Sequence, residues 1–433
     1  MGRLIIISLP LPVPRATIAR VTIALAILGG VVALIAVRQI GSVRLQIWQI
    51  MAGGALAMLV TARLTPAEAL RAIDLDVMLF LFGMFVLARA LEASGLLEDL
   101  AWRLFSRARS VDGLVVLMLF GAGAGSAVLM NDTLAIVGVP VAVALARAHR
   151  VRPRVTLLAL AFAVTAGSVA SPIGNPQNLL VALDGGAGNA FLTFARDLGV
   201  PALGALILSY IALRLAYPAD FHGDALVHVR GGIRDRSLAR LGGSALGLLC
   251  ALIAARIALI VVDSPIDLRL TYIALAPAGL VLGLSRHRVG IVRGIDWPTL
   301  AFFAALFVVV GGVNATGVTE EVVARLGDRI ASTPAVLAAG AVLSQVVSNV
   351  PFVALYLPAL DAAGGSREAL MALAAGSTLA GNLTLIGAAS NVIVVDNAER
   401  RFGERVGFWE FTRIGAPLAF AQLALTWGWL TLT

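Results

Sequence analysis

The sequence has little charge for its length. Charged residues fill 13% of its 433 positions, whereas soluble domains carry about 25%, and all 33 basic residues are arginine because the chain has no lysine. Apolar residues make up 59% and form runs near 20 residues long, the length of a transmembrane helix. A β-barrel would show short alternating segments instead. The composition therefore predicts an all-α polytopic membrane protein.

Cysteine and histidine are also scarce. The single cysteine, Cys250, lies in an apolar run, which excludes a disulfide framework and argues against a thiol mechanism. The 4 histidines all lie in arginine-containing loops, away from membrane depth. The chain has no Walker loop, no nucleophile elbow and no zinc-binding His-Glu helix, so we do not expect an enzyme. The net charge of +8 comes from arginines in loops and does not indicate nucleic acid.

Apolar runs predict about 10 transmembrane helices. We place them at about 17–37, 45–62, 75–92, 155–183, 191–217, 239–262, 268–285, 296–314, 368–397 and 408–431. Two longer stretches, 111–147 and 334–361, are interrupted by polar residues. Each is either a re-entrant hairpin with its tip at the midplane or a pair of full spans. Segments 96–108 and 318–331 are amphipathic, and we expect them to lie along the interface.

The two halves of the chain match in order. Residues 74–104 align with 296–326 at a constant offset, and Pro140 pairs with Pro358. Each half holds five spans and one hairpin, an odd number of crossings, which turns the second half upside down. The sequence thus predicts two inverted repeats, the arrangement of many secondary transporters.

The first repeat covers 17–217 and the second 239–431, joined by a polar linker at 218–238. Most arginines fall on one side of this topology, and the positive-inside rule places that side in the cytoplasm. The linker is then cytoplasmic and both termini are periplasmic. We expect a multi-pass protein of the bacterial inner membrane, with no cleaved signal peptide before the first long helix.

Polar signatures interrupt the apolar stretches twice in each half. Polar groups at membrane depth are tolerated only when they are buried in protein or line a watery cavity, so matched interruptions point to a transport site. The predicted substrate- and ion-binding residues are Asn131, Asp132, Thr133, Gly174, Asn175, Gln177, Asn178, Ser348, Asn349, Gly387, Ser390 and Asn391. The simpler interpretation is a set of polar kinks that only pack helices.

Asp132 is the most informative of these residues. A carboxylate at this depth is unfavourable unless it binds a cation or takes up a proton, so we predict a sodium or proton site. The alternative is a protonated or asparagine-paired Asp132 that braces the hairpin tip. The neutral amides and broken helices suit an anion together with Na⁺. A coupling Na⁺ near Asp132, Asn175, Asn349 and Asn391 is the one cofactor considered.

These signatures resemble those of the ion transporter superfamily. That superfamily includes divalent anion/sodium symporters, arsenite permeases, NhaD-type antiporters and citrate-transporter-like domains. Asn131-Asp132-Thr133 and Ser348-Asn349-Val350 partly match the symporters' Ser-Asn-Thr tips, and Asn-Asp in the first tip is similar to the arsenite branch. The loops from Gly174 to Asn178 and, more loosely, from Gly387 to Asn391 resemble a glycine loop followed by Pro-Pro-Asn.

The resemblance covers nearly the whole chain and implies a homodimer with an elevator-type movement. By this analogy, the transport part is 111–217 and 334–431, and the scaffold is 17–108 and 239–331.

The sequence therefore predicts a secondary active transporter. It would move a small anion, either dicarboxylate-like or an inorganic oxyanion, coupled to Na⁺ or H⁺. The alternatives are a Na⁺/H⁺ antiporter with Asp132 as the shared carrier, an arsenite-type metalloid efflux permease and, from another class, a non-coupled channel or membrane scaffold. The expected partners are a small anionic substrate, the lipid bilayer and a second copy of the chain, with no nucleic acid.

Overall fold

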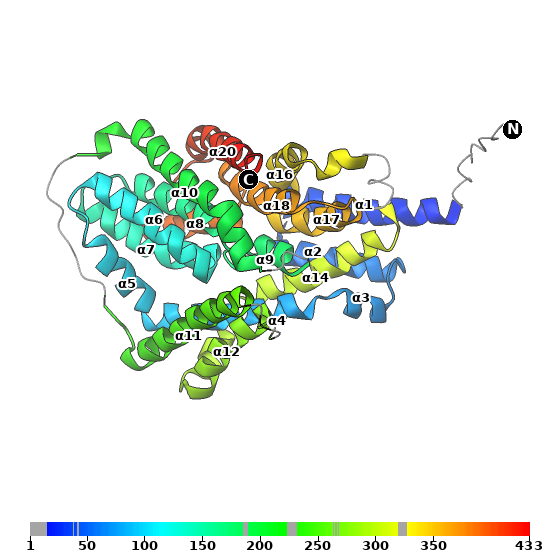
Figure 1. Ribbon diagram of the computed structural model, residues 1–433, viewed down its shortest axis with the longest axis horizontal. Coiled ribbons are helices and arrows are strands. Elements are labelled where there is room, and N and C mark those ends of the chain that lie inside the picture. Colours follow the sequence, from blue (N-terminus) through cyan, green and yellow to red (C-terminus); the bar gives the residue numbers. More distant parts are fainter. Residues whose placement is uncertain are drawn as a thin grey trace. The chain divides into compact units, whose positions relative to one another are not determined.

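The computed structural model describes residues 15–433 except 38, 41–42, 185–188, 223–231, 263, 265, 267 and 319–326 (Figure 1). In this range the chain is helical apart from a small antiparallel ribbon, β1 (Gln39–Ile40) and β2 (Val43–Arg44). The excluded positions take in most of the expected amphipathic segment 318–331 and the middle of the linker 218–238. The chain divides into two compact units, Met1–Ile73 with Ala301–Arg325, and Asp74–Leu300 with Leu326–Thr433.

The smaller unit packs helices closely through glycine. It contains α1 (Arg15–Val37), α2 (Ile47–Val60), α3 (Pro66–Ala72) and most of α14 (Trp297–Asn314). A Cβ on Gly54 of α2 would lie 2.4 Å from a methyl of Val31 in α1 and 3.3 Å from one of Val309 in α14. Helix α3 starts with a capping box, in which Thr65 and Glu68 satisfy each other's backbone N–H groups.

The larger unit begins with helices that pack on α4 (Leu75–Ser94). They are α5 (Leu96–Phe105), α11 (Arg236–Val261), α12 (Leu270–Leu284) and α13 (Arg288–Arg293). A Cβ on Gly83 would lie 2.7 Å from the carbonyl oxygen of Ala274, so α4 and α12 approach backbone to backbone. The Thr271 hydroxyl also donates to Asp76 at 2.6 Å. Helix α5 coincides with the predicted amphipathic segment 96–108.

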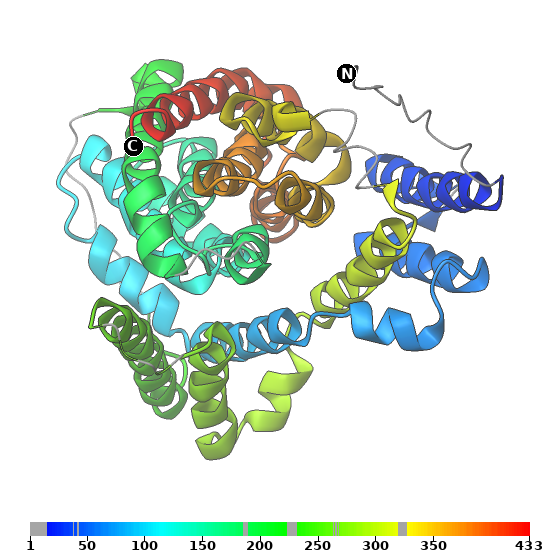
Figure 2. The same ribbon diagram turned by 45° about the vertical axis from the view of Figure 1, so that its right-hand side comes forward.

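The rest of the larger unit repeats one sequence of elements. The first series is α6 (Val111–Leu129), α7 (Asn131–Ala148), α8 (Pro153–Ser168), α9 (Pro176–Asp184), α10 (Ala190–Ala216) and the short turn η1 (Pro218–Asp220). The second series follows the short turn η2 (Gly327–Ala331) and is α16 (Thr333–Val347), α17 (Asn349–Ala362), α18 (Arg367–Leu379), η3 (Ala380–Asn382), α19 (Ala389–Phe402) and α20 (Phe408–Leu430). Each series is a helical hairpin, a broken helix and a long helix, and α10 lies beside α20 in both views (Figures 1 and 2).

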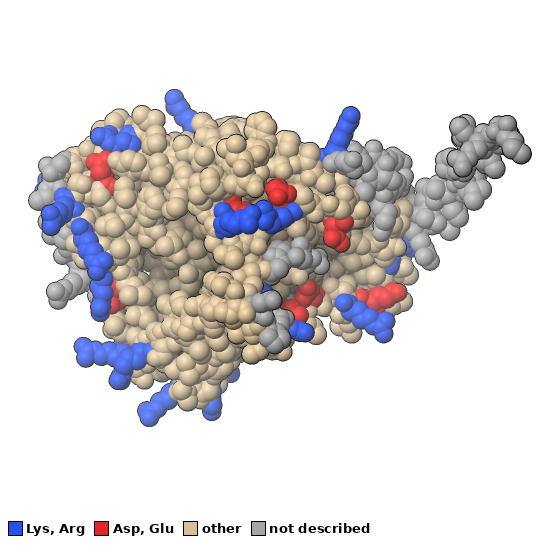
Figure 3. All heavy atoms as spheres, in the orientation of Figure 1, with Lys and Arg blue, Asp and Glu red and all other residues tan. Residues whose placement is uncertain are grey.

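Hydrophobicity confirms the multi-pass class. Among the described residues, 6 helices are long and apolar enough to cross a membrane, namely α4, α6, α7, α10, α11 and α14. Shorter apolar helices include α2, α8, α12 and α16. Most of the surface visible in Figure 3 carries neither sign of charge, as a lipid-facing protein requires. The expected fold class, an all-α polytopic membrane protein with repeated halves, is therefore confirmed.

Two ion pairs join the repeats at equivalent positions. Arg154 at the start of α8 lies 3.1 Å from Glu410 in α20, and Arg367 at the start of α18 lies 3.0 Å from Asp197 in α10. In both pairs the arginine begins a broken helix and the acid belongs to the long helix of the other repeat. Arg367 is the repeat counterpart of Arg154, and Glu410 is the repeat counterpart of Asp197. Both counterparts are 213 positions apart.

These two ion pairs lie near opposite ends of α10. The Tyr217 hydroxyl, just past the end of α10, donates to Glu410 at 2.8 Å, whereas Asp197 is 20 positions earlier in the same helix. At 1.5 Å per residue that is about 30 Å, the thickness of the hydrocarbon core. Equivalent contacts at opposite faces are what an inverted repeat produces.

Further pairs gather on the Glu410 face. Arg147 pairs with Glu404 at 2.9 Å, and the Arg152 side chain binds the Asp220 carboxylate. Burial by itself raises the pKa of Asp220, but hydrogen bonds from the Arg152 side chain and backbone outweigh it and hold that pKa below its usual value. These contacts bring the loop after α7 and the segment before α20 to one face, as the arginine distribution predicted.

Cysteine labelling tests this two-faced arrangement. We expect Arg405→Cys and Arg196→Cys, in a Cys250→Ser background, to react with a membrane-impermeant maleimide from opposite sides. The reason is that Arg196 adjoins Asp197 at one end of α10, whereas Arg405 adjoins the Glu410 face. Labelling of both positions from the same side would contradict the inverted arrangement.

Candidate substrate and ion site

Each hairpin turns at a single residue with a strained backbone. Helix α6 ends at Met130 with φ 68° and ψ 141°, and α16 ends at Ser348 with φ 76° and ψ 155°. Residues with a Cβ seldom occupy this region, and such strain persists only where the surrounding structure imposes it. The next residues, Asn131 and Asn349, begin α7 and α17. The predicted tips are therefore sharp turns at equivalent positions in the two repeats.

The arms of the two hairpins differ in length. Helices α16 and α17 have 15 and 14 residues, and α6 and α7 have 19 and 18. At 1.5 Å per residue these are about 21–23 Å and 27–29 Å, against a hydrocarbon core of about 30 Å. The helices of the second hairpin are thus too short for each to cross the hydrocarbon core, which is expected of a re-entrant segment. The helices of the first hairpin are nearly as long as the core is thick.

Glycine lets each broken helix fold back on itself. A Cβ on Gly174 would lie 2.4 Å from the carbonyl oxygen of Ser168, and one on Gly387 would lie 2.8 Å from that of Gly381. Real Cβ atoms essentially never make such contacts, so only glycine fits at either place. The two contacts are equivalent in the repeats, which explains why both signatures contain this glycine.

An asparagine closes each break. The amide nitrogen of Asn178 donates to the carbonyls of Ser168, Val169 and Ser171 at 3.0–3.3 Å. The amide nitrogen of Asn391 donates to the carbonyl of Gly381 at 2.8 Å, the repeat counterpart of the Ser168 carbonyl. The carbonyls lie where the helix is interrupted, and the Ser168 and Ser171 carbonyls also accept backbone N–H groups at 3.3 Å, so the asparagines add side-chain hydrogen bonds that hold each break together.

The hairpin tips contact the breaks. The backbone N–H of Asn131 donates to the carbonyl of Gly174 at 2.8 Å. In the second repeat, Gln345 of α16 donates to the carbonyl of Ala380 at 2.7 Å and accepts from the Thr384 hydroxyl at 2.9 Å. Each tip and the break of its own repeat therefore form one polar region.

The first break is also bound to the second repeat. The hydroxyl of Thr378 in α18 accepts from the amides of Asn175 at 3.2 Å and Gln177 at 3.3 Å. It donates to the amide oxygen of Asn178 at 3.3 Å. The Asn175 oxygen accepts from the Asn178 backbone N–H at 2.9 Å. The Asn175 and Asn178 amides thus have protein partners and brace the break.

The second break has unpartnered oxygens instead. The amide oxygens of Asn349 and Asn391 and the hydroxyl of Ser390 are buried without a hydrogen-bond partner in the described part of the chain. The hydroxyl of Thr165, the repeat counterpart of Thr378, is also buried and has no hydrogen-bond partner among the described residues. Buried polar atoms nearly always have partners, and functional sites are the usual exceptions. The two repeats therefore differ where a ligand would bind.

Asp132 lies at the start of α7, directly after the first tip. Its backbone N–H donates to the side chain of Asn131 at 2.9 Å, and its side chain is partly buried. No arginine or histidine among the described residues pairs with its carboxylate. Thr133 beside it is also partly exposed. The first tip thus offers an unpaired acid.

Sequence reasoning missed a buried amide relay behind the second break. The Asn382 amide nitrogen donates to Gln422 of α20 at 3.0 Å, and Gln422 donates to the Ala205 carbonyl at 3.0 Å and the Ser209 hydroxyl at 3.2 Å. The Ala205 carbonyl can only accept, so the amide nitrogen of Gln422 must face it and the Gln422 oxygen must face Asn382. The amide nitrogen of Asn382 then donates to that oxygen, and the Asn382 oxygen has no partner among the described residues. Isolated polar residues in apolar helices, such as Gln345 and Gln422, were the available signal.

Matched hairpins and broken helices in a multi-pass helical protein define the class as a secondary membrane transporter. The family model described as "Citrate transporter" matches residues 4–369, and the chain belongs to this family. An uncharacterized transporter of Mycobacterium tuberculosis is 32% identical over 373 residues, covering 82% of this chain and 85% of that protein. The silicon efflux transporter LSI3 of Oryza sativa subsp. japonica is 25% identical over 436 residues, covering 86% and 90%.

A solved structure supports the fold independently. The YdaH transporter of Alcanivorax borkumensis, whose structure is described as having an unusual topology, has a TM-score of 0.55 over 97% of both chains. Its sequence identity is only 18%, so the likeness concerns the fold alone. The expected resemblance to the ion transporter superfamily is confirmed at the level of family and fold.

The two closing asparagines should respond differently to leucine. We expect Asn178→Leu to lower the unfolding temperature more than Asn391→Leu, because it removes three hydrogen bonds to backbone carbonyls rather than one. Each lost bond costs about 1–3 kcal/mol when its partner stays buried. Thermal unfolding of the purified proteins in one detergent measures the difference. Equal shifts would show that the two breaks are braced alike.

Proposed function

We propose that this secondary transporter moves a small anion across the bacterial inner membrane, coupled to Na⁺ or H⁺. One observation carries the proposal: four helices begin at the four signatures. They are α7 at Asn131, α9 at Pro176, α17 at Asn349 and α19 at Ala389. A helix N-terminus carries a partial positive charge, so it attracts an anion.

The contacts among these elements support one shared site. Helix α7 packs against α19, and α17 packs against α9, so each hairpin meets the broken helix of the other repeat. Within each repeat the tip also contacts its own break. We infer that the anion lies among the four N-termini, where the unpartnered Ser390 hydroxyl could donate to it.

Asp132 is the natural carrier of coupling. It is the only acid among the signature residues, and the neutral oxygens of Asn131, Asn349 and Asn391 supply further ligands for a hard cation such as Na⁺. We place the coupling ion near Asp132 and the second break. Asn175, Gln177 and Asn178 then act by holding the first break, since their contacts run to Thr378.

A second candidate substrate is an undissociated oxyacid. The unpartnered amide oxygens of Asn349, Asn382 and Asn391 are acceptors, and acceptors require a cation or hydroxyl donors. A neutral oxyacid supplies such donors. One relative is named as a silicon efflux transporter, which is compatible with this chemistry.

The proposed transport part is 111–217 with 334–431, and the scaffold is 17–108 with 239–331. The paired contacts of Arg154 with Glu410 and Arg367 with Asp197 support the first assignment, because they join its two halves. An elevator-type movement, a homodimer, a cytoplasmic linker at 218–238 and periplasmic termini complete the proposal.

Flux into proteoliposomes tests the function. The panel is citrate, succinate, phosphate, arsenite and silicic acid, each with an imposed Na⁺ or pH gradient. We expect one of the anions to accumulate against its own gradient only when a cation gradient is present. Accumulation of silicic acid or arsenite alone would favour the second candidate. Downhill movement without accumulation of any solute would indicate a channel and contradict both.

Asp132→Asn separates the coupling ion from the substrate. The amide keeps the shape and removes the charge, so we expect Na⁺ or H⁺ dependence to be lost while exchange of internal for external anion persists. Asp112→Asn serves as the matched control and should keep the cation dependence, because it makes the same change at an acid outside the signatures that is bound by Tyr210 and Arg214. Wild-type cation dependence in Asp132→Asn would show that this carboxyl only braces the tip. Loss of exchange together with coupling would favour the antiporter interpretation.

A further inference from the structure

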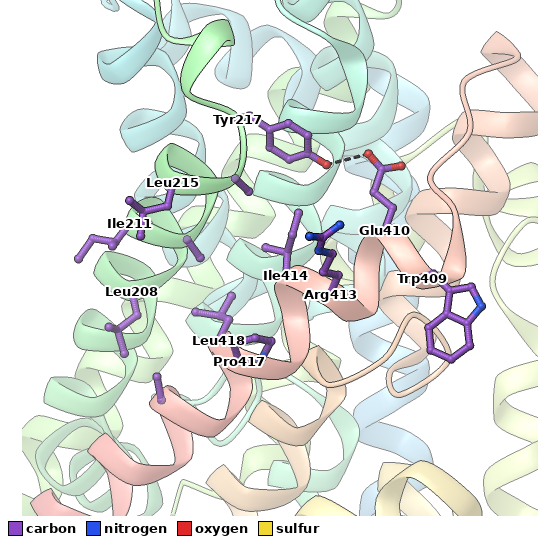
Figure 4. Close-up of a pocket in the computed structure, with 13 residues that line it drawn as sticks. Leu208, Ile211, Leu215, Tyr217, Trp409, Glu410, Arg413, Ile414, Pro417 and Leu418 are labelled. Atoms are coloured by element: carbon purple, nitrogen blue, oxygen red, sulfur yellow. Dashed lines mark hydrogen bonds between the residues drawn. The ribbon is translucent and has the colours of Figure 1, made fainter.

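A groove of about 880 Å³ runs between α10 and α20, away from the hairpins and breaks (Figure 4). Its wall is apolar along most of its length, with Leu208, Ile211 and Leu215 from α10 and Ile414 and Leu418 from α20. Both helices are membrane-spanning in the topology above, so this wall faces the hydrocarbon region. A cavity of this size is large enough for a drug-sized or larger apolar ligand.

One end of the groove is polar. There the Tyr217 hydroxyl donates to Glu410 at 2.8 Å, and Glu410 also pairs with Arg154 at 3.1 Å. A tyrosine hydroxyl is protonated at physiological pH, so Tyr217 acts as the donor in this bond. The acid at this end is therefore already compensated by two protein partners.

Arg413 is the charged residue of the groove that has no ion-pair partner among the described residues. It lies one helical turn beyond Glu410, is exposed, and makes no ion pair or hydrogen bond with any residue that the structure describes. Trp409 stands at the rim with 78% of its surface exposed. Figure 4 shows Tyr217 facing Glu410 near one end, Arg413 close to both, and Leu208, Leu418 and Pro417 farther along the groove. An unpaired guanidinium and an amphipathic indole are typical of the lipid–water interface.

We infer that this groove binds a phospholipid with an anionic headgroup. The headgroup phosphate would pair with Arg413 beside Trp409, and an acyl chain would follow the apolar wall. Guanidinium recognises phosphate through a planar fork of N–H donors, which matches the headgroup charge. The polar end also lies on the arginine-rich face, where an anionic leaflet attracts basic residues.

Quenching of Trp409 by brominated lipids tests this inference in the full chain. The parent variant keeps Trp409 and replaces the other tryptophans by phenylalanine, at Trp48, Trp102, Trp297, Trp427 and Trp429. We expect brominated phosphatidylglycerol to compete about fivefold better than brominated phosphatidylcholine, the effect of about one basic residue near an anionic lipid. Arg413→Gln should abolish this preference. Ala216→Phe, which narrows the groove, should weaken quenching by both lipids.

Arg405→Gln is the matched control, because Arg405 is equally exposed but pairs with Glu399 at 2.8 Å. It should keep the preference. Equal quenching by the two lipids, or a preference that survives Arg413→Gln, would overturn the inference. Relief of quenching by inorganic phosphate would indicate a site for the free anion instead, and would overturn it too. If the parent variant fails to fold, mass spectrometry can measure how much phosphatidylglycerol co-purifies with the native-sequence protein and with Arg413→Gln. The inference then predicts less phosphatidylglycerol on Arg413→Gln. Neither readout depends on transport.

Discussion

The structure depends on one constraint: backbone groups released at a helix break must find partners inside the membrane. Water cannot reach them through lipid, and each unmet group costs several kcal/mol by order of magnitude. The chain meets this demand with turn hydrogen bonds and with Asn178 and Asn391, whose amides bind carbonyls where α8 and η3 end. Glycine at 174 and 387 brings those carbonyls within reach. The polar signatures are thus required by the fold before they serve any substrate.

The two repeats differ in how fully the polar side chains at their breaks are hydrogen-bonded, and our functional proposal rests on this difference. In the first break, Thr378 binds Asn175, Gln177 and Asn178, so the amides are occupied. In the second break, Ser390 stands where the first has Gln177, and the Ser390 hydroxyl and the Asn391 oxygen have no partner among the described residues. A symmetric pair of satisfied breaks would only hold helices together. In this asymmetric pair, the first break is braced by side-chain hydrogen bonds, and the second is where we propose that a ligand binds.

Charge follows a similar division. At the two faces, Arg154 with Glu410 and Arg367 with Asp197 join the repeats through compensated pairs. Beside the first tip, Asp132 makes no ion pair with any residue that the structure describes, and we propose that it carries the coupling cation or proton. At the lipid boundary, Arg413 is unpaired and suited to an anionic headgroup.

The sequence by itself predicted the multi-pass helical class, the repeated order and the positions of the breaks, although it placed single spans at 155–183 and 368–397, where the structure has broken helices. Hydropathy, helix length and the glycine and proline punctuation are local properties, and the bilayer imposes one solution on them. Only the tertiary structure decided which polar side chains form hydrogen bonds within the protein and which have no partner among the described residues. Thr378 meets Asn175, and Gln422 meets Asn382, across distances in sequence that no local pattern records. Hydrogen-bond partners depend on angles and separations of about 3 Å, and these exist only once the two repeats have packed together.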